Sequence, residues 1–259
     1  MLVTGASAGL GEHLAREAAK AGARVVLVAR RMDRLAMLAA ELGRHRAVDV
    51  AADVRHDGDL ERAVEVANRT FGPVDVLIAN AGFSVGGPLE CLSVGDYARQ
   101  FETNFFGVLR TIYAALPDLK RTRGAIGIVG SANGFLALPG WSAYCTSKFA
   151  LRGLAESLRA ELAPQGIAVT HFAPGFVATE FRTVDESGQH TRKDPIPRFI
   201  QASPDRAARR MLRALTSNRR ELVLTGHARL GVALSRHAPR ITAAALRAAA
   251  SSLTRASRR

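Results

Sequence analysis

Cysteine is scarce in this chain, whose 259 residues include only Cys91 and Cys145. Two thiols exclude a small domain held together by several disulfides and favour a reducing compartment, the cytoplasm. No uninterrupted apolar run reaches the roughly 18 residues that a membrane-spanning helix requires. Histidines, cysteines and carboxylates never cluster at the spacing of metal ligands, so we predict no metal ion. A glycine-rich segment follows Met1 almost at once, and we therefore expect no secretory signal.

Acidic residues are absent after Glu221. The seven arginines that follow, just over half of the formal net charge of +13, are Arg229, Arg236, Arg240, Arg247, Arg255, Arg258 and Arg259. Such a charge excess raises the question of nucleic-acid binding. The basic tail has no aromatic residue that could stack on bases, so we predict no nucleic-acid partner.

Short apolar runs alternate with segments of helical length. The runs cover residues 24–28, 74–79, 125–129, 167–172 and 221–224, and the expected helices cover roughly 10–21, 33–42, 57–70, 93–120, 143–163 and 204–216. Near-continuous apolar runs are typical of strands buried on both faces of a parallel sheet. The alternation predicts an α/β fold, a Rossmann-type doubly wound parallel sheet with helices on both faces. Its first strand, at residues 1–3, is unusually short.

A glycine-rich loop, Thr4-Gly5-Ala6-Ser7-Ala8-Gly9-Leu10-Gly11, lies between the first strand and the first helix. Glycine allows a tight turn and lets backbone N–H groups approach a pyrophosphate at a helix N-terminus. A purely structural turn is the alternative. The position at the first strand–helix junction favours a dinucleotide site that includes Gly5, Ser7, Gly9, Leu10 and Gly11.

The end of the second strand indicates which dinucleotide binds. An NAD site places an acid there for the ribose hydroxyls, whereas an NADP site places a cation for the 2′-phosphate. The sequence has Ala29-Arg30-Arg31 and no acid before Asp33. Arg30 could donate two hydrogen bonds to a phosphate, although a solvated pair of arginines at a helix start is the alternative. We predict NADP(H) as the cofactor.

Tyr144 and Lys148 stand four residues apart in a predicted helix, so both side chains lie on one face. Ser131 ends an apolar run thirteen residues before Tyr144. A phenol, an ammonium and a hydroxyl beside a dinucleotide loop are the groups that hydride transfer to a carbonyl carbon requires. A lysine next to a phenol would lower the phenol pKa toward the operating pH.

Together these residues resemble the classical short-chain dehydrogenase/reductase family over roughly residues 1–225. The further motif positions that carry the resemblance are Asp53, Val54, Asn80, Ala81, Gly82, Asn104, Pro174, Gly175, Val177 and Thr179. The resemblance implies a seven-stranded Rossmann sheet. It also implies homodimers or homotetramers that pair through residues 93–120 and 143–163.

The resemblance also implies roles for the catalytic set. Tyr144 would be the general acid/base, Lys148 would bind the nicotinamide ribose, and Ser131 would hold the substrate oxygen. Asn104 would hold a water that links Lys148 to solvent. The predicted function is an NADP(H)-dependent oxidoreductase that interconverts a carbonyl and an alcohol. A regulatory protein that senses NADP(H) without turnover is the second hypothesis, although it has no need of this catalytic set.

The substrate side of the sequence is apolar. Phe83, Leu136, Leu138 and Trp141 flank the expected site, which favours a hydrophobic ketone or aldehyde. Residues 176–203 are long and rich in turn-forming residues, and we expect them to form a lid.

Residues 226–259 are predicted to form a basic amphipathic extension beyond a catalytic domain of residues 1–225. The arginines that would share one helical stripe are Arg229, Arg236, Arg240, Arg247 and Arg258. Pro239 is expected to divide this helix in two. Three interpretations stay open: peripheral binding of residues 229–259 to an anionic membrane surface, packing on the body or on a second subunit, and disorder.

Overall fold

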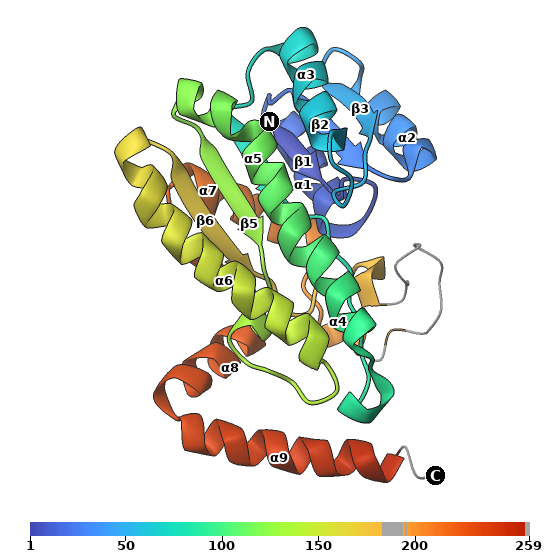
Figure 1. The fold of residues 1–259 in the computed structure, drawn as a ribbon, viewed down its shortest axis with the longest axis vertical. Coiled ribbons are helices and arrows are strands. Elements are labelled where there is room, and N and C mark those ends of the chain that lie inside the picture. Colours follow the sequence, from blue (N-terminus) through green and yellow to red (C-terminus); the bar gives the residue numbers. More distant parts are fainter. Residues whose placement is uncertain (183–193, 195, 257–259) are drawn as a thin grey trace.

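The computed structural model describes residues 1–182, 194 and 196–256. Seven parallel strands form one sheet in the order β3-β2-β1-β4-β5-β6-β7 (Figure 1). The strands are β1 Leu2–Thr4, β2 Val25–Ala29, β3 Ala47–Ala51, β4 Val76–Ala79, β5 Ala125–Val129, β6 Ala168–Ala173 and β7 Glu221–Val223. The predicted doubly wound parallel sheet is therefore confirmed.

Helices cover both faces of the sheet. They are α1 Gly9–Lys20, α2 Met32–Leu42, α3 Asp59–Phe71, α4 Val94–Phe101, α5 Gly107–Thr122, α6 Ser142–Leu162, α7 Pro204–Thr216, α8 Gly226–His237 and α9 Pro239–Ala256. One core cluster joins the sheet to α1, α2 and α7 through residues such as Leu14, Leu35 and Met211. A second joins the other face to α3, α5 and α6 through residues such as Leu60 and Leu151. Two separate cores are what a doubly wound sheet requires.

The short first strand lies at the centre of the sheet. Leu2 is in register with Val26 of β2 on one side and with Leu77 of β4 on the other. All three residues of β1 are buried. A three-residue strand is sufficient here because both of its edges are hydrogen-bonded and both of its faces are covered by helices.

The strand order reverses between β1 and β4, which places a crevice at their carboxyl ends. The glycine loop leaves β1 at that edge, and the Asn80-Ala81-Gly82 turn leaves β4 beside it. Ser131 follows β5 and Pro174 follows β6 at the same edge. The topology therefore gathers four separate motifs into one region.

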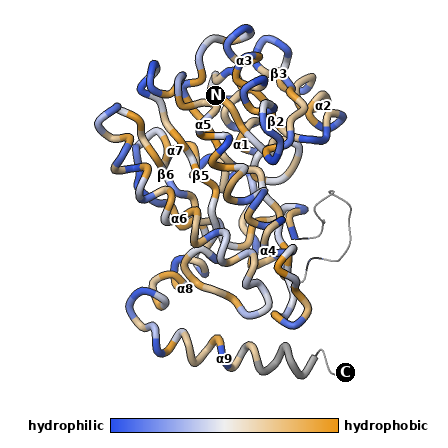
Figure 2. The backbone as a smooth tube through the Cα atoms, in the orientation of Figure 1, coloured by the Kyte–Doolittle hydropathy of each residue, from blue (hydrophilic) through white to orange (hydrophobic). Residues whose placement is uncertain are grey.

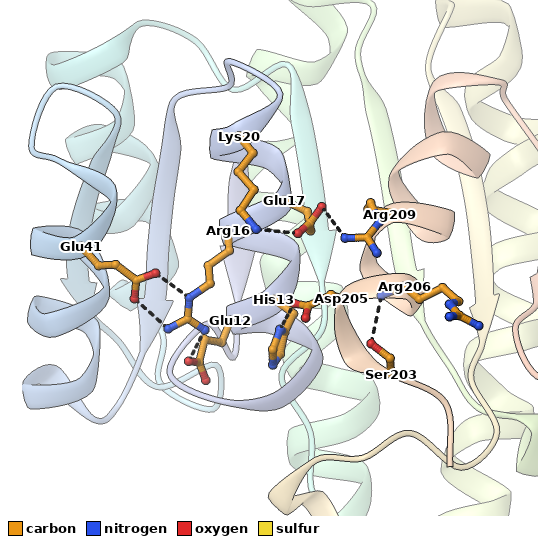
Figure 3. Close-up of polar contacts among 10 residues, drawn as sticks. All are labelled: Glu12, His13, Arg16, Glu17, Lys20, Glu41, Ser203, Asp205, Arg206 and Arg209. Carbon is orange, nitrogen blue, oxygen red and sulfur yellow. Dashed lines mark hydrogen bonds and ion pairs between the residues drawn. The ribbon is translucent and has the colours of Figure 1, made fainter. Parts of the chain in front are cut away.

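Ion pairs hold helix α1, whose first turn contains part of the glycine loop, against its neighbours (Figure 3). Arg16 binds Glu12 within α1 and donates two hydrogen bonds of 2.8 Å to Glu41 of α2. His13 Nδ1 lies 2.5 Å from Asp205 at the start of α7. These contacts tie the glycine loop to both flanking helices.

Two local features differ from the expectation. Strand β3 was not among the predicted apolar runs, because Asp49 interrupts its sequence and only two of its five residues are buried. The single helix expected over 93–120 is interrupted by a π-helical turn, Glu102–Phe106, which separates α4 from α5. Such turns insert one residue into the helical repeat and redirect nearby side chains.

The C-terminal extension forms two helices that meet at Pro239, as predicted. Helix α8 packs on the body, since Ala228 and Val232 are buried and Ser235 donates to the Phe135 carbonyl. Helix α9 runs beyond α8 at the end of the molecule away from the sheet (Figure 1), and none of its described side chains is buried. Figure 2 shows it as a mixture of apolar and polar positions. Within the part of the chain described, no helix combines the length and apolarity needed to span a bilayer.

Candidate active site

One cleft at the carboxyl edge of the sheet contains nearly all of the predicted site residues. Its lining includes Gly5, Ser7, Gly9, Leu10, Arg30, Asp53, Val54, Asn80, Ala81, Gly82, Ser131, Tyr144, Lys148, Pro174, Gly175, Val177 and Thr179. Of the predicted set, Gly11 and Asn104 are not part of this lining. Predicted residues up to 174 positions apart in the chain, Gly5 and Thr179, thus share one surface.

The glycine loop has the shape of a cradle for a ligand. Gly5 and Gly9 adopt positive φ values of 67° and 57°, which other residues rarely adopt. A Cβ atom at Gly11 would lie 2.3 Å from the Gly5 carbonyl oxygen, so this glycine allows α1 to pack on the loop. The Asn80 amide donates to the Thr4 carbonyl at 2.9 Å and links the loop to the end of β4.

Tyr144, Lys148 and Ser131 come together and are nearly inaccessible, with exposed fractions of 8%, 3% and 8%. Helix α6 brings the Lys148 ammonium to 5.7 Å from the Tyr144 ring centroid. Lys148 Nζ also donates to the Val129 carbonyl at 3.0 Å, which anchors it to the end of β5. The Ser131 hydroxyl forms a hydrogen bond with Tyr144 and accepts another from the Asn133 N–H at 3.1 Å.

Burial governs the pKa values of this pair. It raises the pKa of Tyr144 to about 12, although the hydrogen bond from Ser131 acts in the opposite direction. Burial also lowers the pKa of Lys148 to about 7. The expected lowering of the Tyr144 pKa by Lys148 is therefore not found, because the closed site disfavours both charges. Tyr144 keeps its proton at neutral pH, which suits a proton donor.

Asn104 lies in the π-helical turn and is fully buried. Its side chain accepts a hydrogen bond from the Phe83 N–H and donates one to the Phe83 carbonyl, both at 3.1 Å. It also donates to Ser147 Oγ at 3.2 Å. The side chain thus holds the turn after β4 against α6 and does not face the cleft.

Arginines surround the end of the cleft beside β2. Arg31 donates to Ser7 Oγ at 3.2 Å and to Glu180 at 2.8 Å, and Arg34 also binds Glu180. Arg30 lies 4.0 Å from Asp53, whose carboxylate is bound by Arg55. Both Arg30, which the sequence predicted, and its neighbour Arg31 line the cleft, and the Arg-Arg pair is the signal that indicates the second arginine. Glu180 had no signal in the sequence, because its partners lie about 150 positions away.

The apolar side of the cleft is smaller than predicted. Phe83 lines it, and Phe181 of the predicted lid lies 5.9 Å from the Tyr144 ring. The Trp141 ring lies 6.3 Å from the Tyr144 ring and is not part of the lining. Leu136 instead packs near Gly231 of α8. Twelve of the 28 residues of the predicted lid, 183–193 and 195, lie outside the described residues. Among described residues, no group of three or more histidines, cysteines or carboxylates could hold a metal ion.

The fold is a doubly wound sheet of the Rossmann type, and the sequence comparison specifies the family. The family pattern for short chain dehydrogenase matches residues 1–190, so the chain belongs to the short-chain dehydrogenase/reductase family. Similar proteins include 11-beta-hydroxysteroid dehydrogenase-like 2 of Arabidopsis thaliana, 37% identical over 71% of this chain. The 3-ketodihydrosphingosine reductase of Bos taurus is 38% identical over 66% of this chain. These matches span only 60% and 54% of the two relatives.

Solved structures agree with the fold. An alcohol dehydrogenase from Thermococcus sibiricus, complexed with 5-hydroxy-NADP, aligns with a TM-score of 0.75 and 31% identity. That alignment covers 86% of this chain and 94% of the other. A 3-ketoacyl-(acyl-carrier-protein) reductase from Brucella melitensis, complexed with NADH, aligns with a TM-score of 0.77 and 27% identity over 87% and 96% of the two chains. A nicotinamide dinucleotide is therefore the class of cofactor that such folds bind.

Proposed function

We propose that this protein is an NADP(H)-dependent oxidoreductase that reduces a carbonyl group to an alcohol. The observation that carries the proposal is the meeting of the glycine loop with buried Tyr144, Lys148 and Ser131 in one cleft. The names of similar proteins, a 3-ketodihydrosphingosine reductase and an alcohol dehydrogenase, support carbonyl–alcohol chemistry. Nothing in these comparisons favours a regulatory protein without turnover.

The residues present fit a dinucleotide that has a 2′-phosphate. Gly5 and Gly11 let the loop pack closely on its neighbours, because a Cβ atom on either would lie only 2.9 Å or 2.3 Å from backbone atoms. Arg31 Nη1 is buried and meets no hydrogen-bond partner among the described residues. A buried guanidinium N–H without a partner is costly unless a ligand completes it. Arg31, together with Arg30 and Ser7, would hold the phosphate.

Tyr144 would complete the reduction by donating a proton. When bound, the cofactor supplies a hydride to the carbonyl carbon, and negative charge then develops on the carbonyl oxygen. The Tyr144 hydroxyl gives its proton to that oxygen, and the electron pair of the broken O–H bond stays on the phenol oxygen. Its pKa of about 12 keeps the proton available at neutral pH. A protonated Tyr144 is the form that the reduction requires.

Lys148 and Ser131 would support this transfer. A charged Lys148 stabilises the phenolate that forms at Tyr144, and its pKa of about 7 lets it return a proton near neutrality. Ser131, hydrogen-bonded to Tyr144, would hold the substrate oxygen in line. Because the Asn104 side chain is committed to Phe83 and Ser147, only its backbone could hold the predicted water.

The test is a turnover assay with purified protein, NADPH or NADH, and a panel of hydrophobic ketones, aldehydes and quinones. Phe83 in the cleft and Phe181 beside Tyr144 motivate the choice of apolar substrates. We expect absorbance at the reduced nicotinamide band to decay with NADPH. Tight NADPH binding without turnover across the whole panel would instead favour the sensing protein.

We also propose that two or four copies associate through the outer faces of α5 and α6, the helices by which family members pair. Three aromatic side chains on or beside these helices are exposed: Phe106 by 45%, Tyr113 by 67% and Phe149 by 40%. Tyr113→Arg would place a charge in that interface and should weaken association by about a hundredfold or more. Light scattering measures the mass, with Tyr113→Phe as the matched control. A monomeric wild type, or an unchanged mass in Tyr113→Arg, contradicts this proposal.

The two C-terminal helices differ in what they contact, which suggests different roles. We propose that α9, with the adjoining exposed residues of α8, binds an anionic membrane surface. Leu230, Leu234 and Ile241 are 63%, 41% and 66% exposed. Arg240 and Arg247 are exposed too, and no acid follows Glu221 to neutralise them. Apolar and basic groups on one exposed element are what a headgroup region accommodates.

Removal of residues 239–259 should therefore abolish sedimentation with anionic vesicles in low salt and leave turnover intact. Arg240→Gln combined with Arg247→Gln should weaken binding about 25-fold, since each cation contributes about 1 kcal/mol at such a surface. Arg44→Gln with Arg69→Gln, two exposed arginines of the body, is the matched control. Equal partitioning of the full-length and shortened proteins would contradict the membrane proposal. Equal binding of the full-length protein to anionic and to uncharged vesicles would contradict it too.

A further inference from the structure

The first turn of α8 is joined to the loop that follows β6. The Phe176 N–H donates to His227 Nε2 at 3.2 Å. The two rings stack, with centroids 4.9 Å apart and an interplanar angle of 24°. Thr225 Oγ1 lies 3.0 Å from the same nitrogen. A residue of the C-terminal extension thus holds a loop of the cofactor cleft.

Gly175 shows how close this approach is. A Cβ atom there would lie 2.2 Å from Thr225 Oγ1, 2.7 Å from His227 Nε2 and 2.9 Å from the Ala228 Cβ. None of these distances is compatible with a side chain. Glycine at this position therefore allows α8 to pack directly on the loop backbone.

The loop connects His227 with the catalytic side of the cleft. Pro174, Gly175, Val177 and Thr179 line the cleft, whereas the Phe176 ring is stacked on His227. Farther along, the Phe181 ring lies 5.9 Å from the Tyr144 ring. A shift of Phe176 would therefore move side chains that face the cofactor and side chains that face Tyr144.

The hydrogen bond from Phe176 determines the protonation state of the His227 imidazole. The Phe176 N–H can only donate, so His227 Nε2 must carry a lone pair and the ring must be neutral, with its proton on Nδ1. Burial lowers the pKa of His227, which favours this neutral form.

We propose that His227 is a positioning residue for the nicotinamide half of the cofactor cleft, acting through the backbone and ring of Phe176. The inference rests on the proposed function. It also adds the first turn of α8 to the elements that shape the cofactor cleft, although the sequence predicted that the catalytic domain ends at residue 225.

A second set of hydrogen bonds limits how far the loss of His227 can loosen the loop. Ala202 donates to the Phe176 carbonyl at 2.9 Å and accepts from the Ala178 N–H at 3.0 Å, so the other edge of the loop is held independently. Loss of His227 should loosen the loop without releasing it. A hydrogen bond and one ring contact correspond to a change in binding of about tenfold.

The test compares two substitutions with a matched control. His227→Phe keeps a ring that can stack but removes the acceptor, whereas His227→Gln supplies an amide oxygen as a new acceptor. His237→Phe, at the exposed end of α8, is the control. Amide hydrogen exchange of residues 174–182 is followed in the cofactor-free protein, and calorimetry measures binding of NADPH and of 2′,5′-ADP, which lacks the nicotinamide half.

In His227→Phe we expect the Phe176 amide to exchange at least tenfold faster and NADPH to bind about tenfold more weakly, with 2′,5′-ADP binding within twofold of wild type. His227→Gln should restore most of the protection and affinity. Wild-type exchange and affinity in His227→Phe would overturn the proposal, as would an equal loss for 2′,5′-ADP. If the wild type binds no NADPH, the proposed function fails, and the exchange data still decide whether His227 holds the loop.

Discussion

Tyr144→Phe is expected to lower kcat for carbonyl reduction by two to four orders of magnitude, the usual contribution of a positioned general acid. The substitution keeps the ring, which is almost fully buried and packs within 5.9 Å of the Phe181 ring, and removes only the hydroxyl. Folding and NADPH binding should therefore stay close to wild type. Steady-state kinetics with the best substrate of the panel measure the loss.

The control for this prediction is Tyr113→Phe, which removes the hydroxyl of a tyrosine that is 67% exposed on α5. Its kcat should equal that of the wild type. Quenching of Trp141, the single tryptophan, can report NADPH binding in both variants, because it lies 6.3 Å from Tyr144. If Tyr144→Phe retained more than half of the wild-type kcat, another group would have to supply the proton.

Arg31→Ala is expected to weaken NADPH binding by roughly 10- to 150-fold and to change NADH binding by less than twofold. A hydrogen bond to a charged group contributes about 1.5–3 kcal/mol, and each 1.4 kcal/mol is a factor of ten. Arg31 is held in the cleft by Ser7 and Glu180 and has a buried N–H group left for the phosphate. Calorimetry with the two cofactors measures the difference.

Arg34→Ala is the matched control, because Arg34 shares Glu180 with Arg31 but is not among the residues that line the cleft. Its preference for NADPH should be that of the wild type. Arg30→Ala should have a smaller effect than Arg31→Ala, since the Arg30 side chain is 44% exposed and its interactions are screened by water. Equal losses of NADPH and NADH affinity in Arg31→Ala would place this arginine at the diphosphate and not at the 2′-phosphate.

The sequence predicted those parts of the fold that depend on local patterns. The helix over 204–216 and the strand over 125–129 were predicted at their observed bounds, because Ser203 and Pro204 mark a helix start and the apolar run has no polar interruption. Strand β3 was missed because Asp49 breaks its apolar pattern. Its position depends on five register pairs with β2, which local composition does not reveal.

The candidate site likewise has features that the sequence predicts and features that it does not predict. Its backbone motifs follow strand ends, and parallel strands bring their carboxyl ends to one edge, so the sequence could anticipate that Gly5, Asn80, Ser131 and Pro174 would meet. The side-chain directions could not be anticipated. Asn104 turns to Phe83 because a π-helical turn interrupts the expected helix, and helical periodicity alone does not predict such a turn.

The sequence by itself determined the family, the alternation of strands and helices, and the chemical types of the predicted catalytic set, since these follow from periodicity, turn residues and motif spacing. Only the tertiary structure decided that Arg31 binds Ser7 and Glu180, how burial sets the pKa values of Tyr144 and Lys148, and that His227 reaches Phe176. Each of these depends on contacts between residues far apart in the chain and on the exclusion of water from the space between them. Local sequence patterns predict neither the contacts nor the exclusion of water.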